Sequence, residues 1–76
     1  MKEILETIIT NLVSDTESVN ITEEITENAI ELKVKVSKDD MGKVIGKQGR
    51  MAKAIRSVIK AISTHNHKKV TVEFLD

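Results

Sequence analysis

Two glycines three residues apart, Gly46 and Gly49, constrain the fold of this chain more than any other feature of its sequence. They enclose Lys47 and Gln48, and they stand between a short apolar segment and a long amphipathic one. Glycine adopts backbone conformations that other residues avoid, and it leaves the backbone uncovered because it has no Cβ. The pattern therefore predicts a tight, bare loop between two helices, where a phosphate can approach the amides at the start of the second helix.

The glycine spacing argues against the two common nucleotide-binding loops. A Walker A loop has four residues between its glycines and then Lys with Ser or Thr. Here three residues separate Gly42 from Gly46, and Lys47 is followed by Gln48. The dinucleotide fingerprint has glycines at its first, third and sixth positions, which these glycines do not match. A plain turn between helices also uses glycine, so the flanking residues decide between the two interpretations.

Charge is distributed unevenly along the chain, although the formal net charge is zero. Residues 1–32 contain eight acidic residues and one lysine, whereas residues 33–76 contain eleven basic and four acidic residues. No acidic residue lies between Asp40 and Glu73. A solvated helix face accounts for basic residues but explains the missing acids less easily. A block of one sign creates a local positive field, which favours a polyanionic partner.

Length and composition indicate a single small domain over residues 1–76. A chain of 76 residues buries a modest core, so we expect stabilisation by a second copy or a partner. The sequence has no cysteine, which excludes a disulfide framework and Cys-based metal or redox sites. The first residues do not resemble a signal peptide, and no apolar run approaches membrane-spanning length. We expect a soluble, cytoplasmic protein.

Hydrophobic periodicity predicts the elements on both sides of the glycine loop. Apolar residues at helical spacing predict a helix over 2–13, while alternation predicts an edge strand over 19–25 and a second strand over 30–36. Ser37 and Asp40 form a capping-box pattern that starts a short helix ending at Gly46. In the first helix, the apolar stripe consists of Ile4, Leu5, Ile8, Ile9 and Leu12.

The second half of the chain predicts a longer helix over 49–63 and a last strand over 70–74. We expect Phe74, the single aromatic residue, to face the core. The predicted buried stripe of the helix consists of Met51, Ile55, Val58 and Ile62, with Ala54 and Ile59 beside it. Its opposite face carries Arg50, Lys53, Ser57 and Lys60.

A helical pair between two strands favours a crossover connection, so the last strand should run parallel to the strand at 30–36. The expected fold is α+β: a three-stranded mixed β-sheet with three helices packed on one face, in the order α-β-β-α-α-β.

The stretch Val44–Arg50, placed between two helices and followed by Ala54 and Ile55, resembles the signature of a KH domain. The extra helix and strand at the N-terminus are similar to the type II arrangement of this fold. The approach Asp40–Gly46 and the chain length are similar to small stand-alone bacterial KH proteins of the KhpA type. Related loops also occur in KH domains of ribosomal and transcription-elongation proteins.

This resemblance implies a non-enzymatic RNA-binding protein that grips about four nucleotides of single-stranded RNA with its G-x-x-G loop. It further implies an RNA chaperone that forms a homodimer or pairs with a larger KH protein of the KhpB/Jag type, with links to cell-wall growth and cell shape. It implies no cofactor. The residues it assigns to RNA contact are Lys43, Val44, Ile45, Gly46, Lys47, Gln48, Gly49, Arg50 and Lys53.

Alternative functions stay open at this point. A KH fold used for dimerisation, with RNA contact supplied by a partner, would expose apolar residues of the helix over 49–63, such as Ile59. Single-stranded DNA is another possible ligand. His65 and His67 are too few for a structural zinc site, and no motif gathers a nucleophile with a base. With no Trp or Tyr for base stacking, we expect weak, salt-sensitive binding with little sequence preference.

Overall fold

The computed structural model describes residues 1–63 and 67–75. Over these ranges the order of elements is helix, strand, strand, helix, helix, strand, as predicted. The elements are α1 (Lys2–Leu12), β1 (Asn20–Ile25), β2 (Ala29–Lys35), α2 (Met41–Ile45), α3 (Arg50–Ile62) and β3 (Lys69–Leu75). Short 3₁₀ turns occupy Thr16–Ser18, Lys38–Asp40 and Lys47–Gly49. None of the described helices is long and apolar enough to cross a membrane.

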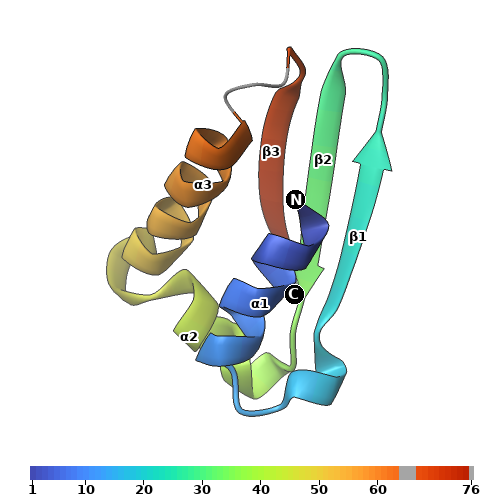
Figure 1. The fold of residues 1–76 in the computed structure, drawn as a ribbon. Coiled ribbons are helices and arrows are strands. Elements are labelled where there is room, and N and C mark those ends of the chain that lie inside the picture. Colours follow the sequence, from blue (N-terminus) through green and yellow to red (C-terminus); the bar gives the residue numbers. More distant parts are fainter. Residues whose placement is uncertain (64–66, 76) are drawn as a thin grey trace.

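The strands form a mixed sheet in the order β1-β2-β3. β1 and β2 are antiparallel and joined by a hairpin, in which the Thr26 amide donates to the Ala29 carbonyl oxygen at 2.8 Å. β2 and β3 are parallel, with Leu32 opposite Val72 and Val34 opposite Phe74, which confirms the predicted crossover. The helices cover one face of the sheet (Figure 1). The predicted fold class is therefore confirmed.

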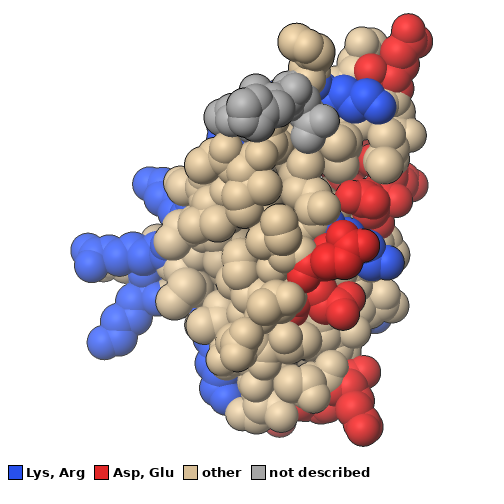
Figure 2. All heavy atoms as spheres, in the orientation of Figure 1, with Lys and Arg blue, Asp and Glu red and all other residues tan. Residues whose placement is uncertain are grey.

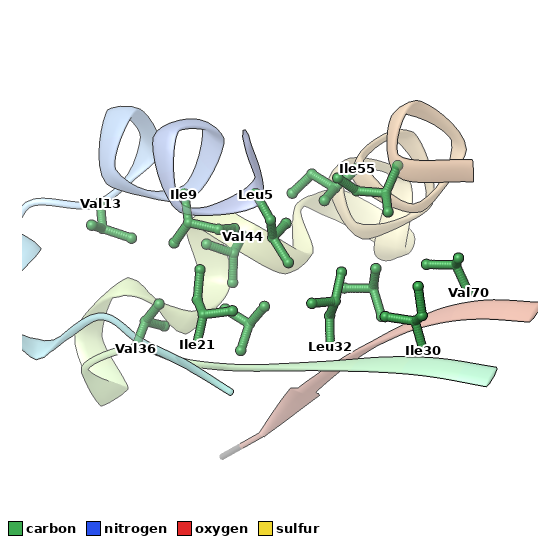
Figure 3. Packing of buried hydrophobic residues seen from close by; sticks show 13 residues of the cluster. Leu5, Ile9, Val13, Ile21, Ile30, Leu32, Val36, Val44, Ile55 and Val70 are labelled. Carbon is green, nitrogen blue, oxygen red and sulfur yellow. The ribbon is translucent and has the colours of Figure 1, made fainter. Parts of the chain in front are cut away.

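The core lies between the helices and the covered face of the sheet (Figure 3). Alternation along β2 sends Ile30, Leu32 and Val34 into it, while Glu31 and Lys35 stay exposed on the other face. Each aliphatic side chain buried in this way contributes about 1.5–3 kcal/mol relative to an exposed one. The other elements add Leu5 and Ile9 of α1, Ile21 of β1, Val44 of α2, Ile55 and Ile59 of α3, and Val70 and Val72 of β3.

Two predictions for the N-terminal elements need correction: the buried stripe of α1 and the alternation of β1. In α1, Leu5 and Ile9 are fully buried, but Ile4 is 41% exposed. In β1, Ile21 is buried and Ile25 is 60% exposed. β1 is an edge strand in which only Ile21 is buried, so its alternation does not persist to the end of the strand.

Asp40 performs a different task from the predicted capping box. Its buried carboxylate accepts hydrogen bonds from the Asp15 amide at 3.0 Å and the Ser14 amide at 3.1 Å. It also accepts from Ser37 Oγ at 2.9 Å and pairs with Lys43 Nζ at 3.2 Å. These donors, the Asp15 and Ser14 amides above all, hold the pKa of Asp40 well below its ordinary value. The carboxylate thereby joins the end of α1 to the start of α2.

The predicted buried stripe of α3 is wrong except for Ile55. The buried residues are Ala52, Ile55 and Ile59, the last only 1% exposed. Met51, Val58 and Ile62 are instead 36%, 45% and 41% exposed, and Ala54 is exposed beside them. Both sets of apolar residues satisfy helical periodicity, and the sequence pattern alone does not say which set meets the sheet.

α3 therefore has three faces. With about 3.6 residues per turn, the core face is flanked on one side by the exposed apolar set and on the other by basic residues. We call Met51, Ala54, Val58 and Ile62 the apolar stripe. Arg50, Lys53, Ser57 and Lys60, predicted on the face opposite the buried stripe, are all exposed. Phe74 is half-buried against the core, as predicted.

Candidate nucleic-acid interface

The loop at residues 46–49 has a backbone that only glycine-rich sequences adopt readily. α2 ends where the Gly46 amide donates to the Gly42 carbonyl oxygen at 2.9 Å. Gly46 has φ 76° and ψ 175°, Gln48 has φ 57°, and Gly49 has φ 74°. Positive φ values disfavour residues with a Cβ. The chain thus turns from α2 into α3 within four residues.

The two loop glycines serve different purposes. A Cβ on Gly46 would lie 2.7 Å from Met51 Cβ and 2.9 Å from the Met51 amide nitrogen, so this glycine lets the loop pack against the start of α3. A Cβ on Gly49 would meet nothing within 4 Å. Gly49 therefore leaves the surface of the loop bare, and a ligand backbone can approach it there.

The N-terminus of α3 opens directly from this loop. Its N-cap residue is Gly49, which has no side chain to accept hydrogen bonds from the first-turn amides. The positive end of a 13-residue helix dipole is therefore presented at the loop surface. Lys47, Arg50 and Lys53 are exposed, and their side chains make no hydrogen bond or ion pair with another described residue. This combination suits a phosphate group.

The nine predicted contact residues lie between α2 and the first turns of α3. Lys43 is exposed but held, because its Nζ pairs with Asp40 and donates to Ser14 Oγ. Val44 has no exposed surface and supports the loop from the core. Ile45, Gly46 and Gly49 are partly buried, whereas Lys47, Gln48, Arg50 and Lys53 are exposed.

A groove between α3 and β3 continues the basic surface beyond the predicted residues. Its cavity of about 350 Å³ is lined on the α3 side by Lys53, Arg56 and Lys60 and on the β3 side by Lys69. Arg56, Lys60 and Lys69 were not predicted as site residues from the sequence. The spacing of Arg56 and Lys60 along α3 was a usable signal, but only the crossover brings Lys69 of β3 beside them. In Figure 2, Lys and Arg side chains project from the side carrying α3, and most acidic side chains lie on the opposite side.

A larger hollow of about 870 Å³ lies at the other end of α2, beside Ser37, Lys38 and Met41. It includes no residue of the 46–49 loop, so volume alone does not mark the interface. Among residues 1–63 and 67–75, no three or more His, Cys, Asp or Glu side chains are grouped to hold a metal. His65 lies outside the described residues.

Comparison with known proteins is consistent with this geometry. The family model described as "KhpA/KhpB, KH domain" matches residues 2–74 of the chain. The chain belongs to the KhpA/KhpB family of KH domains. As a member of this family, it is not an enzyme.

Full-length relatives of this KH chain carry the name "RNA-binding protein KhpA". The Clostridium perfringens protein is 53% identical over 75 residues, covering 99% of this chain and all of that protein. The Listeria monocytogenes protein is 46% identical and covers both chains completely. The Bacillus subtilis protein is 41% identical over the whole of this chain and 94% of its own length. The similarity thus includes every element described above.

Proposed function

We propose that this KH-family chain, a single domain over residues 1–76, binds single-stranded RNA in the cytoplasm and acts as an RNA chaperone. The observation that carries the proposal is the bare 46–49 loop, which opens onto uncapped α3 amides between unpaired cations. About four nucleotides would lie across it. The name "RNA-binding protein" carried by the relatives supports the same ligand.

Each part of the interface has a physical role in this proposal. The loop and the α3 amides take the sugar-phosphate backbone, which approaches closely because Gly49 has no side chain. Lys47, Arg50 and Lys53 supply charge, and Gln48 supplies hydrogen bonds. Val44 and Ile45 fix the loop from beneath, and Lys43 contributes to the positive field while bound to Asp40.

We further propose that the protein works as a homodimer or with a larger KH protein of the KhpB/Jag type, in a role linked to cell-wall growth and cell shape. The apolar stripe on α3 supports this part. Its three largest side chains are each more than a third exposed on one face of one helix, and a second protein surface would bury them. The basic residues point away from that face, so both surfaces can be used at once.

The apolar stripe also favours a second candidate function: a dimerisation module whose RNA contact comes mainly from the partner. The two functions differ in what the isolated chain does. An RNA chaperone of the first kind binds single-stranded RNA alone, whereas the interaction module binds RNA only with its partner present. Competition between RNA and single-stranded DNA of equal sequence tests the choice of nucleic acid.

The decisive variant carries Lys47→Asp and Gln48→Asp, which reverse the charge of the loop. Both side chains are exposed, so we expect a retained fold and strongly reduced RNA binding by fluorescence anisotropy. A matched control carries Lys35→Asp and Asn28→Asp, which change the net charge equally at exposed positions outside the loop. RNA affinity that falls equally in both variants would refute a specific interface at the loop.

A further inference from the structure

The hollow of about 870 Å³ beside α2 has no part in the proposed RNA interface. It lies at one end of the sheet, where the turn at Thr16–Ser18 meets the start of β1 and the end of β2 (Figure 1). Its volume is within the range of about 300–1,000 Å³ that ligand sites have. We call it the end hollow. The residues that line it include Ser18, Asn20, Lys35, Ser37, Lys38 and Met41, and none of the nine residues predicted to contact RNA.

Two lysines of the end hollow carry charge that the rest of the described chain does not neutralise. Lys35 and Lys38 are exposed, and neither side chain makes a hydrogen bond or ion pair with another described residue. The cross-strand neighbours of Lys35 are Asn20 on β1 and Leu75 on β3, which are both uncharged. No acidic residue lines the end hollow. An anionic group of a ligand is therefore complementary to it in charge.

The uncharged polar groups of the end hollow match a ligand that also donates hydrogen bonds. Ser18 Oγ donates to an Asp15 carboxylate oxygen at 2.6 Å, and Ser37 Oγ donates to Asp40 at 2.9 Å. A hydroxyl whose proton is engaged in this way has only acceptor lone pairs left for a ligand. The Asn20 side-chain amide has no hydrogen-bond partner among the described residues, and it offers donors and an acceptor. A phosphate dianion only accepts, whereas a peptide main chain has both N–H and C=O groups.

An apolar wall and acidic surroundings narrow the choice of ligand further. Val36 and Met41 also line the end hollow, and the unbranched, polarisable side chain of Met41 adapts to an apolar group placed on it. The exposed acids Glu17 and Asp39 each adjoin a lining residue in the sequence. A polyanionic strand that extended beyond the end hollow would meet these acids, whereas a short segment with one or two carboxylates would not. The lining also offers no aromatic ring on which a base could stack.

We propose that the end hollow binds a short acidic peptide segment of a protein partner, in which a carboxylate stands beside an aliphatic side chain. The carboxylate pairs with Lys35 and Lys38, and the aliphatic side chain lies on Met41. The peptide main chain forms hydrogen bonds with the Asn20 amide. This inference goes beyond the proposed function and does not depend on it. RNA at the 46–49 loop leaves the end hollow open, because the two surfaces share no residue.

The test titrates the ¹⁵N-labelled full chain with short synthetic peptides of equal length, blocked at both ends and followed by nuclear magnetic resonance. The first peptide alternates leucine with glutamate, and we expect it to shift the amides of residues 18–20 and 35–41. A peptide that alternates leucine with glutamine lacks the charge and should bind about 2- to 30-fold more weakly, as two exposed ion pairs predict. A peptide that alternates glycine with glutamate lacks the aliphatic side chain and should bind about 10-fold more weakly.

Variants locate the contact on the protein. Lys35→Gln with Lys38→Gln should weaken binding of the leucine–glutamate peptide about 2- to 30-fold and leave the leucine–glutamine peptide unaffected. The matched control, Lys2→Gln with Lys68→Gln, removes the same charge outside the end hollow and should leave both affinities unchanged.

Equal affinity for the glutamate and glutamine peptides, or an unchanged affinity in the Lys35 and Lys38 variant, would overturn the inference. Displacement of the peptide from the end hollow by oligouridylate would assign the hollow to nucleic acid and overturn it as well. The proposed function is tested separately by charge reversal at the 46–49 loop, so failure of the peptide to bind leaves that proposal standing.

Discussion

The three glycines allow a quantitative test of the loop geometry, because alanine at each should change stability differently. Gly42 lies in α2 with open space where a Cβ would stand, so Gly42→Ala should stabilise the protein by about 0.5–1 kcal/mol. Gly49 has a left-handed backbone but no steric neighbour, so Gly49→Ala should cost about 1–2 kcal/mol.

Gly46→Ala should be the most damaging of the three. Its φ and ψ values lie in a region used almost only by glycine, which costs alanine about 1–3 kcal/mol. The new Cβ would also lie 2.7 Å from Met51 Cβ, and relieving such overpacking costs typically about 1–3 kcal/mol. The combined loss of about 2–6 kcal/mol is a large part of the total stability of a domain, about 5–15 kcal/mol.

Urea denaturation followed by circular dichroism, at one protein concentration, measures all three variants. The expected order of stability is Gly42→Ala, unmodified protein, Gly49→Ala, Gly46→Ala. A Gly46→Ala variant no less stable than Gly49→Ala would refute the close contact between the loop and α3. A destabilised Gly42→Ala variant would refute the open environment inferred for α2.

Three further predictions concern the apolar stripe, Asp40 and the cations at the loop. Ile62→Glu should keep the fold but reduce self-association in sedimentation experiments, whereas Ile59→Ala should cost about 2–5 kcal/mol of stability. Because folding lowers the pKa of Asp40, its contribution to stability is present at neutral pH and is lost as the pH falls below about 5. The difference in urea midpoint between the unmodified protein and Asp40→Asn should therefore shrink from about pH 6 to about pH 3, and a constant difference would contradict this. Lys47→Ala should lower the salt dependence of RNA binding by nearly one phosphate contact, and Lys43→Ala by less, as titrations at several salt concentrations can determine.

The fold was largely predictable because its strongest patterns are local. The alternation at 30–36 interleaves Lys and Glu with Ile, Leu and Val, so both the strand and its buried face follow from it. Gly46 and Gly49 likewise mark the loop by their own conformational needs. The parallel crossover follows from the rule for a helical pair between strands.

What could not be predicted depends on contacts between distant parts of the chain. The apolar residues of α3 form two sets about a quarter turn apart, and only the docking of the helix selects Ile59 over Val58. Asp40 has a local capping pattern, yet its carboxylate binds amides 25 and 26 residues away. Arg56 is one of several basic residues in the sequence, and its hydrogen bond to the Val72 carbonyl oxygen forms only because β3 lies beside α3.

The central claim is that single-stranded RNA lies across the 46–49 loop and the first turn of α3. Nuclear magnetic resonance of the ¹⁵N-labelled protein during titration with a short single-stranded RNA tests it most directly. We expect the largest shift changes at the amides of residues 46–53, together with those of the groove along β3. Changes confined to the uncovered face of the sheet, with the loop amides unmoved, would contradict it.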